Sequence, residues 1–203
     1  VDKSVAVLPF ADLSQNRDQE WFADGLAEEI LNALARTPDL LISARTSTFS
    51  YKGTDKDIPT IAQDLGVAHV LEGSVRRAGD RIRVTAQLIR AADGFHLWSQ
   101  NYDRDTTDVI EIQEDLAIQI ASALETTMDP ESLADMVRVG TSSVAAYQDY
   151  IHGAGLRARS NLENHPALAT EAYQYFEKAV AQDPQFSAAH GAAAGYWLTQ
   201  MSL

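Results

Sequence analysis

The stretch from Val70 to Arg104 constrains the fold of this 203-residue chain more than any other. Two strand-like segments flank Gly79-Asp80, and glycine at the first position of a two-residue loop is typical of a tight β-hairpin. Successive strand side chains point to opposite faces, so one face of the hairpin is apolar and the other polar. The expected apolar pairs are Val75 with Val84, Gly73 with Ala86 and Leu71 with Leu88, and the polar face carries Arg76, Arg83, Ser74, Thr85, Glu72 and Gln87. A third strand follows Gly94, which predicts an antiparallel meander and favours a binding module over an enzyme.

Strand and helix patterns alternate before the meander. Ser4–Phe10 predicts a buried strand ended by Pro9, and Asp39–Ser43 predicts a second strand. Between them, Asp18 is expected to cap a helix that runs to about Arg36, so the two strands should be parallel. A loop over 45–56, a short helix from Asp57 to Gly66 and a helix over about 106–126 complete the pattern. These segments predict an α/β domain over residues 1–128, with a mixed parallel and antiparallel sheet and helices packed on it.

The rest of the chain shows only helical patterns. Residues 129–143 are interpreted as a linker because they end in Gly140-Thr141-Ser142-Ser143. Helices are expected over Val144–Arg159, Pro166–Gln182 and Ser187–Met201. Alanines crowd the last of these, which favours close helix packing. The sequence therefore predicts an all-α domain over residues 144–203.

The composition narrows the classes of partner and chemistry. The chain has 29 acidic and 16 basic residues, a net charge of −13, which argues against nucleic acid as a partner. It has no cysteine, so disulfides, thiolate metal sites and cysteine nucleophiles are excluded. No apolar run approaches the roughly 20 residues that span a bilayer. Because the first residue is Val1, we expect a piece of a longer protein whose membrane anchor, if it has one, lies outside this chain.

Three short motifs are compatible with catalytic or ligand-binding chemistry, and each also has a simpler structural interpretation. Asp12 after a strand is similar to the first metal-binding aspartate of class III cyclases. The sequence has no second matching aspartate strand, so a turn residue is the simpler interpretation of Asp12. Gly153–Ala158 fits G-x-G-x-x-A, yet no strand precedes it, so close helix packing is preferred. Asp103 and Asp105 are half a metal site or, more simply, helix caps. We predict no catalytic, cofactor-binding or metal-binding residue.

The candidate partner-binding residues lie on the meander. Arg76, Arg81 and Arg83 belong to the only dense basic patch in this acidic chain. Arg76 opposite Arg83 is unfavourable unless an anion, or a carboxylate such as that of Glu72, lies between them. The functional interpretation is a docking patch for an acidic partner segment or for the rest of the parent protein, and the plain one is a solvated face with local ion pairs. The remaining candidates, His96 and Trp98, alternate on one strand face and either contact a partner or lie under the last helix of the α/β domain.

The helical segment resembles a tetratricopeptide repeat. Ala172, Phe176, Ala179 and Pro184 fall at the spacing of its second helix, with the proline ending the unit. The helix before it fits this consensus poorly. The resemblance implies one repeat, the start of a second and a truncated array that binds a peptide in its groove.

The first domain, from about Lys3 to Glu125, resembles the TolB amino-terminal-domain-like family of bacteria. The segments that carry the resemblance are Val5–Ser14, Trp21–Ile30, Ser43–Ser47, Leu71–Arg77 and His96–Arg104. In that family the domain often lies between tetratricopeptide repeats and an effector, either an adenylate cyclase or a winged-helix DNA-binding domain. The resemblance implies a non-catalytic module and carries no catalytic residue to this chain.

These patterns together predict a non-catalytic protein-interaction and signal-input region of a bacterial regulator. The effector would lie outside the chain, and the location would be the periplasmic part of a membrane-anchored protein, with the cytoplasm as the alternative. Two other functions stay open: a nucleotide-handling, cyclase-type enzyme that uses Asp12, and a small-molecule sensor with a pocket between the sheet and the helices.

Overall fold

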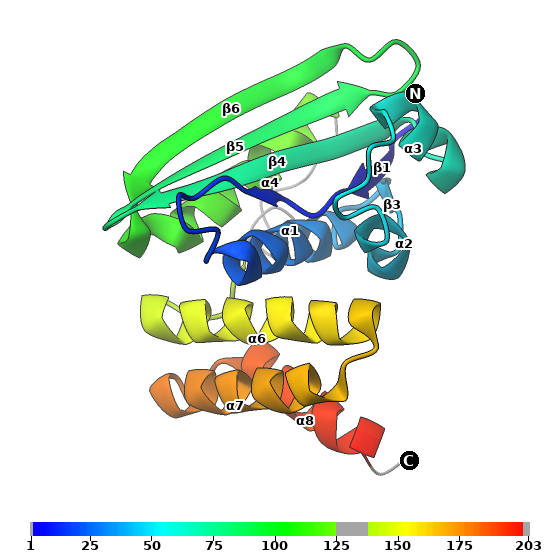
Figure 1. Cartoon of the computed structure of the whole chain (residues 1–203). Coiled ribbons are helices and arrows are strands. Elements are labelled where there is room, and N and C mark those ends of the chain that lie inside the picture. The colour runs from blue at the N-terminus through cyan, green and yellow to red at the C-terminus, as the bar shows by residue number, and fades with distance from the viewer. Residues whose placement is uncertain (1, 125–137, 201–203) are drawn as a thin grey trace.

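The computed structural model describes residues 2–124 and 138–200, and the side chains of residues 162 and 197–200 are left out of the description. One mixed sheet forms the top layer in Figure 1. Helices α1 (Glu20–Ala35) and α4 (Val109–Ala123) lie beneath it, and α6 (Val144–Glu163) lies beneath α1. Helices α7 (Pro166–Gln182) and α8 (Ser187–Gln200) are farther from the sheet. The predicted class, a mixed sheet with helices packed on it, is confirmed.

The sheet order is β3-β1-β4-β5-β6. Strand β1 (Ser4–Val7) is parallel to β3 (Leu41–Ile42) and to β4 (His69–Ala78), as the strand-helix-strand pattern predicts. Strands β5 (Arg81–Arg90) and β6 (His96–Asp105) continue the sheet in antiparallel fashion. The two-residue β2 (Ala11–Asp12), which follows Pro9, pairs in parallel with the far half of β4. It was not predicted.

The hairpin register is the one expected from its loop. Val75 pairs with Val84, and the pairs Gly73 with Ala86 and Leu71 with Leu88 follow in the same register. Gly79 has φ 60°, a conformation that the absence of a Cβ makes accessible. The inward side chains of both strands are buried in the core, while the opposite face of the meander carries polar residues. One face of the meander is therefore covered by helices, and the other is open except near the start of β4, where Val70 packs against Ile61 and Ala62.

Helix α1 buries the predicted stripe of Phe22, Leu26, Ile30 and Leu34 against the sheet. Its cap differs from the prediction, because the N-cap residue is Gln19 and the Asp18 carboxylate accepts a hydrogen bond from the Gln19 side chain. The backbone N–H of Gln19 is instead bound by Asp12, across the loop. The turn before α1 is therefore held from β2.

Two shorter helices connect β3 to β4. The segment over 45–56, predicted as a loop, contains α2 (Arg45–Phe49), whose five residues are too few to show a helical period. Helix α3 (Ile58–Leu65) has the predicted ends, since the carboxylate of Asp57 accepts from Thr60 N–H and Gly66 adopts φ 65°. A 3₁₀ turn, η1 (Thr106–Asp108), precedes α4. Of the predicted linker, residues 129–137 lie outside the described residues, and the described part has no helix or strand.

Helix α6 packs closely on α1 and continues to Glu163, four residues past the predicted end at Arg159. Asn164 ends it in a left-handed conformation, φ 50°. A Cβ added at Gly155 would lie 2.4 Å from the carbonyl oxygen of Trp21, so only glycine allows this approach. A Cβ at Gly153 would likewise lie 2.6 Å from the Phe176 ring. The preferred interpretation of the G-x-G-x-x-A motif, close helix packing, is confirmed.

The hydrophobic core runs without a break from the sheet into the helical segment. One cluster of buried side chains includes Val84 of β5, Leu26 of α1, Ile151 of α6 and Phe176 of α7. Within the described residues, no helix is long and apolar enough to cross a membrane.

Candidate functional site

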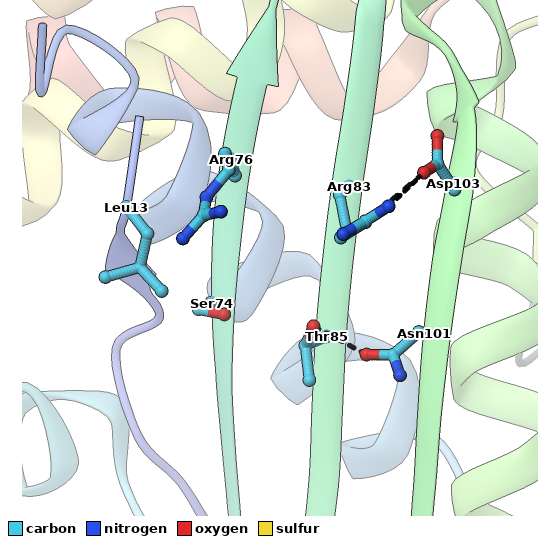
Figure 2. Close-up of a pocket in the computed structure, with 7 residues that line it drawn as sticks. All are labelled: Leu13, Ser74, Arg76, Arg83, Thr85, Asn101 and Asp103. Atoms are coloured by element: carbon cyan, nitrogen blue, oxygen red, sulfur yellow. Dashed lines mark hydrogen bonds and ion pairs between the residues drawn. The ribbon is translucent and has the colours of Figure 1, made fainter. Parts of the chain in front are cut away.

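The candidate site is a cavity of about 500 Å³ on the open face of the sheet. Three strands contribute two residues each, and one residue after β2 closes the side (Figure 2). A volume of this size lies within the range of ligand pockets in proteins, roughly 300–1,000 Å³. The lining residues are Leu13, Ser74 and Arg76, Arg83 and Thr85, and Asn101 and Asp103.

The wall beside β4 is held by Asp12. Its two carboxylate oxygens accept the backbone N–H groups of Ser14, at 2.9 Å, and Gln19, at 2.7 Å. Ser14 Oγ in turn accepts the backbone N–H of Arg77, and Leu13 N–H donates to Val75 C=O. Partial burial opposes ionisation of Asp12, but these hydrogen bonds outweigh it and lower the pKa of its carboxyl. Asp12 is therefore a turn residue that fixes the position of Leu13 next to Arg76.

Charge is distributed unevenly across the site. Asp103 accepts from Arg83, with Nη2 to Oδ2 at 2.6 Å, and from Arg81, with Nη2 to Oδ1 at 2.7 Å. These contacts, the one from Arg83 foremost, lower the pKa of the Asp103 carboxyl. Arg81 also reaches Asp105 at 3.0 Å. Asp103 and Asp105 are thus ion-pair partners of arginines. Asp105 is the N-cap residue of η1, as the cap interpretation predicts, but its side chain makes no capping hydrogen bond, and Asp103 lies within β6.

Arg76 differs from these arginines. It pairs with Arg83 in the β4–β5 register, as predicted. Of the two arginines of this pair only Arg83 binds a carboxylate among the residues that the structure describes, and that carboxylate belongs to Asp103 and not to Glu72. Figure 2 shows Arg83 turned toward Asp103 and Arg76 turned toward Leu13. Across residues 2–124 and 138–200, the structure gives the Arg76 guanidinium no hydrogen bond or ion pair.

The other two predicted site residues do not join this cavity. Trp98 pairs with Leu88 on the inner face and packs, half-buried, against the core. His96 is exposed at the start of β6, beside a register shift between Leu88 and Ile89. The site therefore contains Arg76 and Arg83, with Arg81 beside it. Sequence reasoning missed the parts played by Leu13, Asn101 and Asp103, although the β5–β6 register places Asp103 opposite Arg83.

Two smaller cavities bear on the alternatives. One of about 170 Å³ lies between the sheet and helices α1 and α6, next to Trp21 and His152. A second, of about 260 Å³, lies among α6, α7 and α8 beside Phe176. Arg157 lines the second cavity, but its guanidinium already binds Glu28 at 3.2 Å and lies over the Phe176 ring. Both are below the usual volume of a small-molecule pocket, but a third cavity of about 450 Å³, between α3 and the ends of β4 and β5 beside His69, lies within that range.

Metal-ligating side chains do not gather in the part of the chain that the structure describes. No group of three or more histidine, aspartate or glutamate side chains there could hold a metal ion. Asp12, Asp103 and Asp105 are each bound by backbone N–H groups or arginines, as described above.

The class of domain that this geometry defines is a mixed sheet whose meander has one helix-covered face and one open, polar face. The chain belongs to the family of the second domain of HilA/YgeH-like transcriptional regulators, whose model matches residues 1–120. This match covers nearly all of the segment that was predicted to resemble TolB amino-terminal-like domains. The predicted association with regulators is confirmed at this level.

Relatives and solved structures add the following similarities. A protein named "Putative adenylate cyclase 3" from Rhizobium meliloti (strain 1021) is 37% identical over 188 residues, which is 92% of this chain and 31% of that protein. The chain thus spans less than a third of that curated relative. TolB from Acinetobacter baumannii matches with a TM-score of 0.45 and 17% identity, over 61% of this chain and 28% of that one. Lipoprotein GNA1162 from Neisseria meningitidis matches with a TM-score of 0.45 and 18% identity, over 59% and 96%.

Proposed function

We propose that this chain is the signal-input region of a bacterial multidomain regulator, that it binds a protein partner, and that it has no chemistry of its own. The observation that carries the proposal is the match of the Rhizobium relative. It spans the sheet and the helical segment together, 92% of this chain, within a protein three times as long that is named after an effector activity. The regulator family of residues 1–120 supports the same role.

The proposed effector lies outside this chain. If the sheet and helices receive a signal for it, exchanging this region should change the control of the effector and not its basal chemistry. The test replaces the matching segment of the Rhizobium relative with this chain, and a second version deletes the segment. We expect cyclic AMP production to persist in both, with its response to growth conditions altered by the deletion. An effector whose output and response are the same with and without the segment would contradict the proposal.

The absence of catalysis is the second part of the proposal. It is supported by Asp12, whose two carboxylate oxygens each accept a backbone N–H and so hold the turn before α1. The competing function, a nucleotide-handling enzyme, needs Asp12 to bind Mg²⁺ and triphosphate. Calorimetry with ATP and Mg²⁺ separates the two, using the wild-type chain and Asp12→Asn. Saturable heat that disappears in Asp12→Asn, or any nucleotide product, would favour the enzyme.

The helical segment is proposed to begin a tetratricopeptide array. The support is that α6, α7 and α8 follow one another along the chain and that Ala172, Phe176 and Ala179 of α7 are buried.

The location that we propose is the periplasm, with the cytoplasm as the alternative. Alkaline phosphatase fused to this region in the parent protein, an enzyme active only where disulfides form, would be active in the first case and inactive in the second.

A further inference from the structure

We propose that the cavity on the open sheet face binds an extended acidic peptide segment of a partner protein, with a glutamate or aspartate carboxylate of that segment on Arg76. The inference rests on the proposed function, because it names the chemistry of the partner that the signal-input region receives.

The first argument is the unbalanced cationic charge. Three arginines, Arg76, Arg81 and Arg83, lie on or beside this face, and two carboxylates, Asp103 and Asp105, are bound to two of them. Like charges directly opposite each other on neighbouring strands are unfavourable. Arg83 is neutralised from β6, so the remaining positive charge is that of Arg76. An anion on Arg76 would give it the negatively charged partner that Arg81 and Arg83 already have.

The second argument is the set of hydrogen-bond donors that line the same cavity as Arg76. Ser74 Oγ lies on the same strand and face, two residues away. Asn101 uses its side-chain oxygen to accept from Thr85 Oγ1 at 2.7 Å, which leaves its amide N–H₂ for a ligand. In the described residues neither Ser74 Oγ nor Asn101 Nδ2 has a hydrogen-bond partner. A planar guanidinium is suited to a carboxylate, which it binds through two parallel hydrogen bonds, while Ser74 and Asn101 offer donors to the rest of a ligand that crosses the three strands.

The third argument concerns size and shape, and it favours a peptide over a free ion. The cavity of about 500 Å³ extends over three strands, far beyond the volume of one carboxylate. Leu13 forms one side with 49% of its surface exposed, so it offers an apolar contact to the methylene groups of an acidic side chain. The net charge of −13 does not prevent this contact, because at physiological salt charges more than about 8 Å away are largely screened.

The experiment titrates the full chain with a labelled, capped hexapeptide that contains two adjacent glutamates, and follows fluorescence anisotropy. The same peptide with glutamines, free glutarate and inorganic phosphate are the comparison probes. We expect saturable binding of the glutamate peptide that weakens as salt increases. Arg76→Gln should weaken it about tenfold or more, because a charge-assisted bidentate contact is lost.

Two further variants separate a specific site from general charge. Asp103→Asn should tighten peptide binding, because it releases Arg83 for the ligand, and misfolding cannot produce a gain of this kind. Arg90→Gln should leave binding unchanged, since Arg90 is already paired with Asp93 at the other end of β5. Equal binding to wild type and Arg76→Gln, or no saturable binding, would overturn the proposal. So would phosphate or glutarate binding at least as tightly as the peptide.

The chimera described above distinguishes this inference from the proposed function. If Arg76→Gln abolishes the response of the chimera to its signal, the peptide site and the input role are both supported. If the peptide fails to bind while the chimera still responds, the ligand assigned to this cavity is wrong and the input role stands. If the peptide binds but deleting the region has no effect on the effector, the input role is wrong and the site stands.

Discussion

At the scale of single residues, helix α1 is unusual because it turns acidic side chains toward the protein interior. Asp24 and Glu28 are nearly inaccessible, and each binds a cation from another element, Lys52 and Arg157 respectively. Glu29 accepts from the hydroxyl of Tyr150 at 3.0 Å. Burying a charge is costly unless it is paired. Burial raises the pKa of the Asp24 and Glu29 carboxyls, so the stability of the packing around helix α1 depends on pH.

Asp24 gives the first prediction. Burial raises the pKa of its carboxyl from 3.8 to about 6, although Lys52 opposes the shift. The folded chain then retains a proton that the unfolded chain has lost, so this group's contribution to stability falls as pH rises from about 4 to 6. Asp24→Asn removes the titrating group and with it this loss. We therefore expect the free energy of unfolding of Asp24→Asn, relative to that of wild type, to increase by up to about 3 kcal/mol between these pH values. Urea unfolding at several pH values measures this, and Asp55→Asn, an exposed loop position, is the control.

His152 predicts the opposite trend. Its ring is stacked between those of Trp21, at 4.1 Å, and Tyr175, at 3.8 Å. Burial, with Lys178 nearby, lowers the pKa of the imidazole from 6.5 to about 4. The unfolded chain takes up the proton first, so stability is lost as pH falls from about 6.5 to 4. His152→Phe should keep the stacking and flatten that part of the stability curve. NMR titration of the His152 ring would contradict the argument if it showed an ordinary pKa.

At the scale of elements, the accuracy of the sequence predictions follows the strength of the local constraint. The β4–β5 register was predicted because a two-residue loop leaves one pairing that buries Val75 and Val84 together. The short β2 and α2 were missed, since two and five residues show no period. The partner of Arg83 was missed because it depends on the β5–β6 register, which contains a shift at Leu88 and Ile89. The unpaired state of Arg76 became visible only once that register was known.

The crossing of α1 and α6 gives a prediction at this scale. Gly155→Ala places a Cβ about where Trp21 C=O lies, and two backbones must move apart to admit it. We expect a loss of stability of about 1–3 kcal/mol, as for other overpacked sites. Gly191→Ala on α8 is the matched control, because its Cβ meets nothing within 4 Å. That change should stabilise the chain by up to about 1 kcal/mol through helix propensity. The denaturant midpoints of both variants test this prediction. Equal shifts of the midpoint in Gly155→Ala and Gly191→Ala would contradict the close-packing argument.

At the scale of the whole molecule, the question is whether the sheet and the helical segment act as one body. The predicted division places a boundary in residues 129–143, most of which lie outside the described residues. The packing across that division is extensive, because Ile151 of α6 and Leu26 of α1 belong to the same buried cluster. The ion pair of Glu28 with Arg157 and the Tyr150–Glu29 hydrogen bond add polar contacts across it. The sheet and the helical segment, although they are separate stretches of the sequence, are therefore expected to unfold together.

Hydrogen exchange measured by mass spectrometry tests this coupling. Opening α6 away from α1 would expose the apolar face of both helices and leave Asp24, Glu28 and Glu29 near an unfilled core, so it should cost nearly as much as global unfolding. We expect peptides from α1 and α6 to exchange at one common rate that rises with urea. Helix α3, whose Ile61 and Ala62 pack on Leu8 and Val70 in a small separate cluster, should open locally and exchange faster. Exchange of α6 through α8 at a rate well above that of α1 would mean that the helical segment detaches, and a signal received by the helices would then reach the sheet by docking and not through a rigid junction.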